Sequence, residues 1–259
     1  MPVSTVPRTA FSTSQEINTL SDFIGFVKTN CPETGTFLFR GQREDHPLSP
    51  KIARITTKGN VIECEEKMLS DFKRRSIPYL TVRIETDWDW LAIAQHHGLA
   101  TRLLDWTSNP LAALWFAVEN PAVEDHPGVV WIYNPGTDDV IADKQKAGPF
   151  DGTKTEVFQP DHIATRIVAQ GGWFTVHKYQ RASGGRPQRF IPLNILDRAK
   201  PLLKKLNIPA KRFPDLRQEL DRCGINSSLI YPGLEGLCSY IQWKHSLYMD
   251  EEAALTTTP

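Results

Sequence analysis

One continuous run, residues 91–107, constrains this chain more than any other segment, because it sets several polar side chains inside a largely apolar sequence. A run that only filled a core would carry none of them, since a buried polar group without a partner costs about 1–3 kcal/mol. These groups therefore either satisfy one another or meet a ligand. The polar residues of the run are Gln95, His96, His97, Thr101, Arg102, Asp105 and Thr107.

The composition is that of an ordinary globular protein, with 259 residues of which 40% are hydrophobic and 23% are charged. The 30 basic and 30 acidic residues give a formal net charge of zero, which argues against a protein that mainly coats nucleic acid or an anionic membrane. Two basic stretches, residues 178–189 and 198–212, keep nucleic acid open as a partner, although solvated faces explain such stretches more often.

The 4 cysteines lie far apart and form no Cys-x-x-Cys pair, so the sequence indicates neither a zinc site nor a disulfide scaffold. Reduced thiols are typical of the cytoplasm. No apolar run approaches the ~20 residues that a membrane span needs, and the first residues carry no charged and apolar leader. We therefore expect a cytoplasmic protein that binds no metal and does not enter a membrane.

Apolar spacing and capping residues predict helices over residues 20–28, 62–75, 87–97, 111–120 and 214–224. Strands are predicted over residues 36–40, 128–133, 173–177 and 189–193, with residues 101–106 extended or looped. Because the two kinds of element do not alternate regularly, the predicted fold class is α+β, a single domain with a mixed or antiparallel sheet and surrounding helices. We expect a flexible arm over residues 1–17, the domain over 18–248 and a flexible tail over 249–259.

Arg40 follows three apolar residues and precedes Gly41, so we expect it at the end of a strand where the backbone can approach a ligand. A permanently charged guanidinium in that position suits a phosphate or a carboxylate. An arginine that merely ties the strand end to a neighbouring acid is an equally good explanation from the residues alone.

Gln95 and His96 fall in the last turn of a predicted helix, and Arg102 and Asp105 follow its glycine stop, so a short loop can bring all four to one wall. Asp105 is expected to hold Arg102 or to orient an imidazole. A satisfied structural network without a ligand is the alternative. The candidate binding residues of this wall are Gln95, Thr101, Arg102 and Asp105, and His96 is a catalytic candidate.

Four further residues have both a structural and a functional interpretation. Thr107 and Ser108 precede a predicted buried helix, where a hydroxyl either caps the helix or positions a ligand. Gln170, before two glycines, can bind an amide-bearing ligand or its own turn. Glu235 lies in a glycine-flanked turn after a β-like stretch, where a carboxylate can project into a cleft, although a helix N-terminus also favours glutamate for its charge.

Four motifs, in this order along the chain, resemble the FRG domain, a bacterial and phage family named after a Phe-Arg-Gly signature. Here the signature is Phe39-Arg40-Gly41, within residues 37–42. The other motifs are the run over residues 91–107 and the stretches over residues 170–175 and 229–237. The resemblance covers about residues 20–245.

An arginine, a hydroxyl pair and a late glutamate also resemble, in order, the signature of mono-ADP-ribosyltransferases. In that superfamily the arginine holds NAD, the hydroxyl positions its nicotinamide side and the glutamate stabilises the reacting ribose. The resemblance implies a related fold and assigns these roles to Arg40, to Thr107 or Ser108, and to Glu235. The chain departs from the pattern in lacking a Ser-Thr-Ser triplet and in having Gly233 two residues before the glutamate.

Three functions are consistent with these features. The first is an enzyme with NAD as substrate, either an ADP-ribosyltransferase or an NAD glycohydrolase, in a toxin or phage-defence role. The second is a module that binds or processes nucleic acid, with the basic stretches on the backbone and the histidine cluster acting on it. The third is a domain that binds a small molecule or a protein without chemistry.

Overall fold

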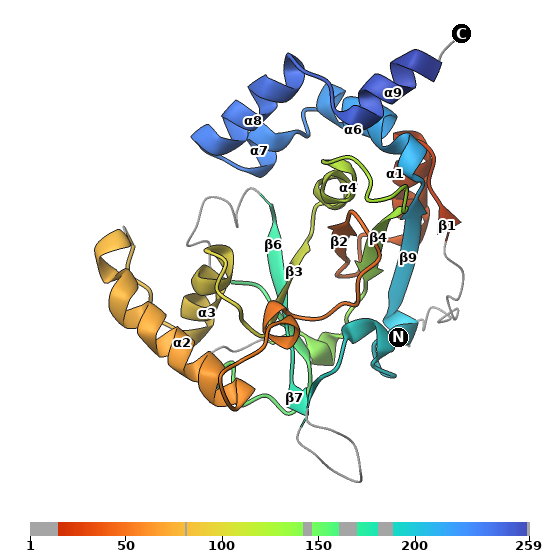
Figure 1. The fold of residues 1–259 in the computed structure, drawn as a ribbon. Coiled ribbons are helices and arrows are strands. Elements are labelled where there is room, and N and C mark those ends of the chain that lie inside the picture. The colour runs from red at the N-terminus through yellow and green to blue at the C-terminus, as the bar shows by residue number, and fades with distance from the viewer. Residues whose placement is uncertain (1–14, 81, 142–146, 161–169, 181–188, 258–259) are drawn as a thin grey trace.

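The fold is built on a seven-stranded sheet in the order β1-β9-β4-β2-β3-β6-β5 (Figure 1). The computed structural model describes residues 15–80, 82–141, 147–160, 170–180 and 189–257. β1 runs parallel to β9 and the other neighbours are antiparallel, so the sheet is mixed and the fold is α+β, as predicted. The strands are β1 (Gln15–Glu16), β2 (Leu38–Gln42), β3 (Leu103–Thr107), β4 (Gly128–Tyr133), β5 (Glu156–Phe158), β6 (Gly172–Val176) and β9 (Leu203–Ile208), and a second, two-stranded sheet pairs β7 (Tyr179–Gln180) with β8 (Arg189–Phe190).

Helices surround this sheet on several sides. α6, α7, α8 and α9 gather at one end of the molecule, whereas α2 and α3 lie beside β3 and β6 (Figure 1). The helices are α1 (Leu20–Asn30), α2 (Val61–Ser76), α3 (Asp87–His96), α4 (Pro110–Val118), α6 (Phe213–Arg222), α7 (Ser227–Ile230), α8 (Leu234–Lys244) and α9 (Met249–Thr257). None of the helices in the described ranges is both long and apolar enough to cross a lipid bilayer.

The helix ends follow the local signals that predicted them. The Asn109 side chain accepts hydrogen bonds from the backbone N–H groups of Leu111 and Ala112, and Pro110 occupies the first position of α4. α3 ends just before Gly98, whose φ of +86° is a conformation that favours glycine. The predictions for these two helices are confirmed to within two residues.

The glycine of the Phe-Arg-Gly signature is required by helix packing. A Cβ atom on Gly41 would lie 1.8 Å from the carbonyl oxygen of Ala113 in α4, so only glycine lets this buried helix rest directly on β2. The expectation that Arg40 ends a strand is wrong. β2 continues to Gln42 because its pairing with β4 extends along its whole length, and α4 makes a close approach to the backbone at Gly41.

Alternation along β2 and β4 divides the core into two layers. Phe39 and Val130 face the layer that contains α4 and α6, whereas Leu38 and Trp131 face the opposite layer with Trp106. Arg40 shares the alternation of Leu38 and so leaves the sheet on the face opposite α4. Both faces of the central strands are therefore covered, and the signature arginine starts from inside the fold.

β2 and β3 are joined much less completely than their neighbours. β2 pairs with β4 from Leu38 to Gln42, and β3 pairs with β6 along all of its residues. Between β2 and β3 the ladder of the described strands contains one pair, Phe39 with Thr107. The sheet therefore has a seam at its centre, which we call the β2–β3 seam.

Regular secondary structure is present in both segments that the sequence placed outside the domain. Residues 249–257, expected as part of a flexible tail, form α9, because Asp250 and Glu251 bind the fully buried Arg217 at 2.7 and 2.5 Å. At the other end, β1 pairs with β9 and Ile17 is fully buried. The rest of the expected arm and tail, residues 1–14 and 258–259, lies outside the described residues.

Candidate ligand-binding site

A cavity of about 280 Å³ opens at the β2–β3 seam. It contains six of the ten predicted site residues, although they come from β2, α3, β3 and the turn before β6. The predicted residues in its lining are Arg40, Gln95, His96, Asp105, Thr107 and Gln170. Phe39, Gly41, Trp106 and Phe116 complete the wall and add aromatic surface to these polar groups.

Arg40 crosses the seam with hydrogen-bonding capacity to spare. Its Nη1 donates to the backbone carbonyl of Asp105 at 2.8 Å and lies 3.8 Å from Oδ2 of the same residue. Its Nε is buried and has no hydrogen-bond partner among the described residues. Burial lowers the pKa of Arg40, against the opposing attraction of Asp105, but an arginine remains charged in proteins. The cavity therefore contains a cation whose donors are only partly used.

A chain of hydrogen bonds leads from the interior to the Asp105 carboxylate. The Leu103 N–H donates to Thr101 Oγ1 at 3.1 Å, and the Thr101 hydroxyl donates to Gln95 Oε1 at 2.7 Å. Gln95 Nε2 then donates to Asp105 Oδ2 at 3.1 Å. Thr101 is fully buried, so it belongs behind the cavity wall rather than in it.

The central part of this site lies within one segment of the chain. Residues 35–126 match the family model of the FRG domain. This FRG segment includes β2, α3, β3 and α4, and therefore every residue that lines the cavity except Gln170. No curated protein and no solved structure matches the chain.

His96 lies in the last turn of α3, as predicted from the glycine stop at Gly98, and it lines the cavity. Its ring centroid is 4.9 Å from that of His97, with the two rings nearly perpendicular. Imidazole is the side chain best suited to exchange protons near neutral pH. His96 therefore brings an imidazole to the described lining of the cavity.

The hydroxyls at the end of β3 serve the turn that follows. Thr107 donates to the Gln170 carbonyl and accepts the Asn109 N–H at 2.9 Å, while the Gln170 amide donates to the Ile230 carbonyl at 3.0 Å. Ser108 lines a different cavity, and its hydroxyl lies 3.4 Å from the Gly171 carbonyl. α4 is capped by Asn109 and not by these hydroxyls, so the capping alternative is wrong for them. Thr107 and Gln170 line the cavity with side chains already bound to the protein.

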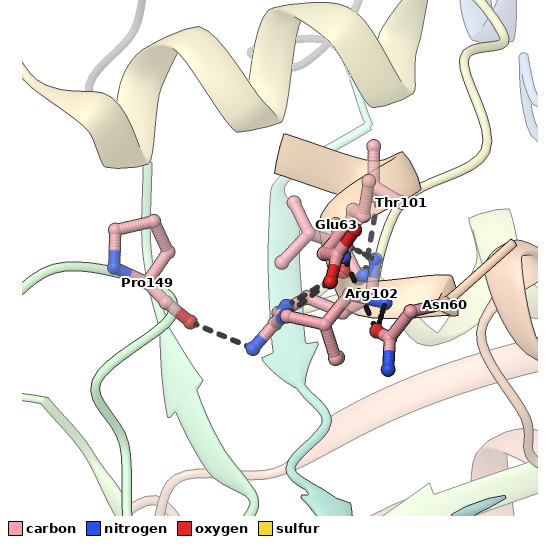
Figure 2. A network of polar contacts seen from close by, with 8 residues as sticks. Asn60, Glu63, Thr101, Arg102 and Pro149 are labelled. Carbon is pink, nitrogen blue, oxygen red and sulfur yellow. Dashed lines mark hydrogen bonds and ion pairs between the residues drawn. The ribbon is translucent and has the colours of Figure 1, made fainter. Parts of the chain in front are cut away.

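Arg102 is held away from the cavity by a partner that the sequence analysis missed. Glu65 of α2 accepts from Arg102 Nε at 3.1 Å, from its Nη2 at 2.9 Å and from its backbone N–H at 2.7 Å. Nη1 reaches the Pro149 carbonyl at 3.5 Å on the other side (Figure 2), and the guanidinium lies 4.3 Å from the Phe150 ring centroid. The expectation that Asp105 holds Arg102 is wrong, because Glu65 satisfies this arginine inside the core.

Glu235 lies apart from the FRG segment and outside the described lining of the cavity. It is exposed in the first turn of α8, and the preceding β-like stretch is the short helix α7. The next residue, Gly236, is fixed by packing, since a Cβ there would lie 1.9 Å from the Tyr231 carbonyl oxygen. The local sequence therefore reflects the contact between α7 and α8.

A buried histidine behind the site was not singled out from the sequence. The Trp106 indole donates to Thr175 Oγ1 at 3.1 Å, Thr175 lies 3.2 Å from His177 Nε2, and Nδ1 of His177 faces the Ile191 carbonyl at 3.4 Å. Burial, with a smaller contribution from the positive charge of Arg40, lowers the pKa of His177 to about 4, against the opposing effect of the hydrogen bond to the Ile191 carbonyl. His177 is therefore neutral at pH 7, and period-two alternation over residues 173–177 was the available signal for its burial.

In the part of the chain that the structure describes, no three His, Cys, Asp or Glu side chains are grouped to hold a metal ion. The cavity at the seam offers one cation, one carboxylate, one imidazole and aromatic rings. These groups suit an anionic organic ligand with a ring and hydroxyl groups.

Proposed function

We propose that the cavity at the β2–β3 seam binds NAD and that the protein cleaves the bond between nicotinamide and ribose, as an NAD glycohydrolase or an ADP-ribosyltransferase. One observation supports this most directly: Arg40, Asp105 and Phe116 converge on the same cavity. A guanidinium suits the pyrophosphate, a carboxylate suits the ribose and a phenyl ring suits a flat heterocycle. A fold related to the ADP-ribosyltransferases is part of this proposal.

The groups in the cavity can carry out the reaction. The carbon–nitrogen bond breaks and nicotinamide leaves with the electron pair, so positive charge develops on the ribose. Asp105 stabilises that charge more in the transition state than in the ground state. The oxygen of water, or a nucleophile of an acceptor, forms the new bond to the ribose carbon, and His96 takes its proton. We assign the carboxylate role to Asp105, because Glu235 lies outside the described lining.

The experiment is incubation of the purified protein with NAD, with nicotinamide release followed by chromatography. We expect release by the wild type, loss in Arg40→Gln and Asp105→Asn, and full activity in Glu235→Gln. Loss in Glu235→Gln with retention in Asp105→Asn would return the carboxylate role to Glu235, as the family resemblance implies. Binding of NAD without release, seen as a rise in Tm, would indicate a binding domain without chemistry. The absence of both binding and release would contradict the proposal.

The described part of the basic stretches does not favour nucleic acid as a second candidate. Arg198 pairs with Asp139 at 3.3 Å, and Lys205 pairs with Asp45 at 2.5 Å. Residues 181–188 of the first stretch lie outside the described residues. Binding of an oligonucleotide that weakens steeply with added salt would support this alternative.

A further inference from the structure

We propose that Thr101 is a positioning residue, which acts through Gln95 to hold the Asp105 carboxylate in the cavity as an acceptor for the hydroxyl groups of a ribonucleotide. The ligand class rests on the proposed function. The positioning itself rests only on the hydrogen bonds behind the cavity.

The direction of each hydrogen bond in this chain is fixed by the first donor. A backbone N–H can only donate, so Thr101 Oγ1 accepts from Leu103, and the Thr101 hydroxyl proton is left for Gln95 Oε1. The Gln95 oxygen is then occupied, and its NH₂ group must face Asp105. Gln95 is thereby held as a donor, in the one orientation that suits a carboxylate.

The carboxylate is left with one oxygen for a ligand. Asp105 Oδ2 faces Gln95 Nε2 at 3.1 Å and Arg40 Nη1 at 3.8 Å, while Oδ1 has no hydrogen-bond partner among the described residues. The Asp105 side chain is 58% exposed, so a ligand can reach it. An ionised carboxylate only accepts hydrogen bonds, and a ribose offers two neighbouring hydroxyl donors.

Loss of the Thr101 hydroxyl would release the Gln95 amide to rotate. Gln95 Oε1 would lack its partner, so the amide would no longer be held in place, its hydrogen bond to Asp105 Oδ2 would weaken and the carboxylate would lose its fixed position. Thr101 is fully buried and lies outside the described lining of the cavity, so it acts on a ligand there only through Gln95 and Asp105. The residue next to it is fixed in turn, because the Arg102 N–H donates to the buried Glu65.

The first test compares two ligands that differ in one hydroxyl, nicotinamide mononucleotide and its 2′-deoxy analogue, by calorimetry. We expect the wild type to favour the ribose form by about tenfold, as one lost hydrogen bond to a charged group implies. Thr101→Val should bring the ratio of the two Kd values towards one, and Thr101→Ser should retain the wild-type ratio. Damage to the fold alone would weaken both ligands equally. A wild-type ratio of one, or an unchanged ratio in Thr101→Val, would overturn the inference.

A second measurement needs no ligand and separates this inference from the proposed function. The side-chain NH₂ signal of Gln95 in NMR spectra, assigned with Gln95→Ala, should exchange slowly in the wild type and in Thr101→Ser but rapidly in Thr101→Val. Equal exchange in all three proteins would refute the positioning role, whatever binds. A wild type that binds neither nucleotide contradicts the proposed function. Slow exchange of the Gln95 NH₂ group that depends on the Thr101 hydroxyl would still support the positioning role of Thr101.

Discussion

Arg40 and Arg102 are two arginines that the sequence places in similar apolar surroundings, and the fold treats them in opposite ways. Arg102 is 4% exposed, and the carboxylate of Glu65 accepts two of its side-chain donors and its backbone N–H. Arg40 has one hydrogen bond to a carbonyl, a distant carboxylate and a buried Nε without a partner in the described chain.

The difference separates a structural arginine from a candidate binding arginine. A buried cation that its partners satisfy stabilises one arrangement of the chain and has nothing left for a ligand. A cation with unused donors beside a cavity carries an energetic cost that a bound anion can remove. The number of satisfied donors is therefore a better guide to function than burial.

The largest expected effect on stability comes from removing the partner of Arg102, the structural arginine. Glu65→Ala leaves Arg102 charged and buried without its partner, so we expect the free energy of unfolding to fall by about 3–5 kcal/mol. Urea denaturation measures this. The double variant Glu65→Leu with Arg102→Met removes both charges and should recover most of the loss, and no recovery would contradict an ion-pair explanation.

The second effect concerns the glycine beside Arg40. Gly41→Ala forces a methyl group against the Ala113 carbonyl, at a distance of 1.8 Å if nothing moves, so we expect a loss of about 3 kcal/mol. Gly25→Ala in α1 is the matched control, because no atom lies within 4 Å of its added Cβ, and it should stabilise by up to about 1 kcal/mol. Equal stability of the two variants would show that α4 does not rest on β2 as described.

The pH dependence of stability should reveal the buried, neutral imidazole of His177. The pKa of His177 is about 4 in the folded protein, below its ordinary value of 6.5, so protonation favours the unfolded chain. The contribution of His177 to stability is complete above pH 6.5 and falls by about 3 kcal/mol as the pH drops to 4. Denaturation of the wild type and His177→Gln across this range should give curves that converge towards low pH. Parallel curves would contradict a buried neutral imidazole.

Substitution of Arg40 is expected to change stability least and ligand binding most. Arg40→Gln removes a cation that the fold only partly satisfies, so the free energy of unfolding should change by no more than about 1 kcal/mol. Binding of NAD should weaken more than tenfold, as judged by calorimetry. A loss of stability as large as that of Glu65→Ala would show that Arg40, like Arg102, is a structural arginine.

Local signals in the sequence predicted most helix positions. Asn109 and Pro110 begin α4, and Gly98 ends α3, because capping and glycine geometry act within a few residues. The full length of β2 was not predictable in this way, since its last two residues are strand only because β4 pairs with them. A strand boundary that depends on pairing with a distant segment, here Gln42 with Val129, leaves no local trace.

The sequence predicted which residues of the candidate site lie near one another, but not which partners they bind. The spacing of Gln95 and Asp105 around a glycine stop indicated that they share a wall, and Gln95 Nε2 lies 3.1 Å from Asp105 Oδ2. The sequence did not indicate that Arg102 would turn to Glu65, 37 residues earlier, because every charged residue of α2 is compatible with an exposed helix face. Long-range ion pairing decides between alternatives that the residues alone leave open.

The cavity lies at the β2–β3 seam, and Arg40 belongs to both. Within the described ladder, the strands β1, β9, β4 and β2 are joined to β3, β6 and β5 by one residue pair, and the Arg40 side chain adds a hydrogen bond across the seam to the side-chain packing of the core. A ligand that draws Nη1 to itself exchanges a bond between the two groups of strands for a bond to the ligand. Binding of such a ligand would then be coupled to how firmly the two groups of strands are joined. By reciprocity, a change in that connection would alter the affinity of the cavity for the ligand.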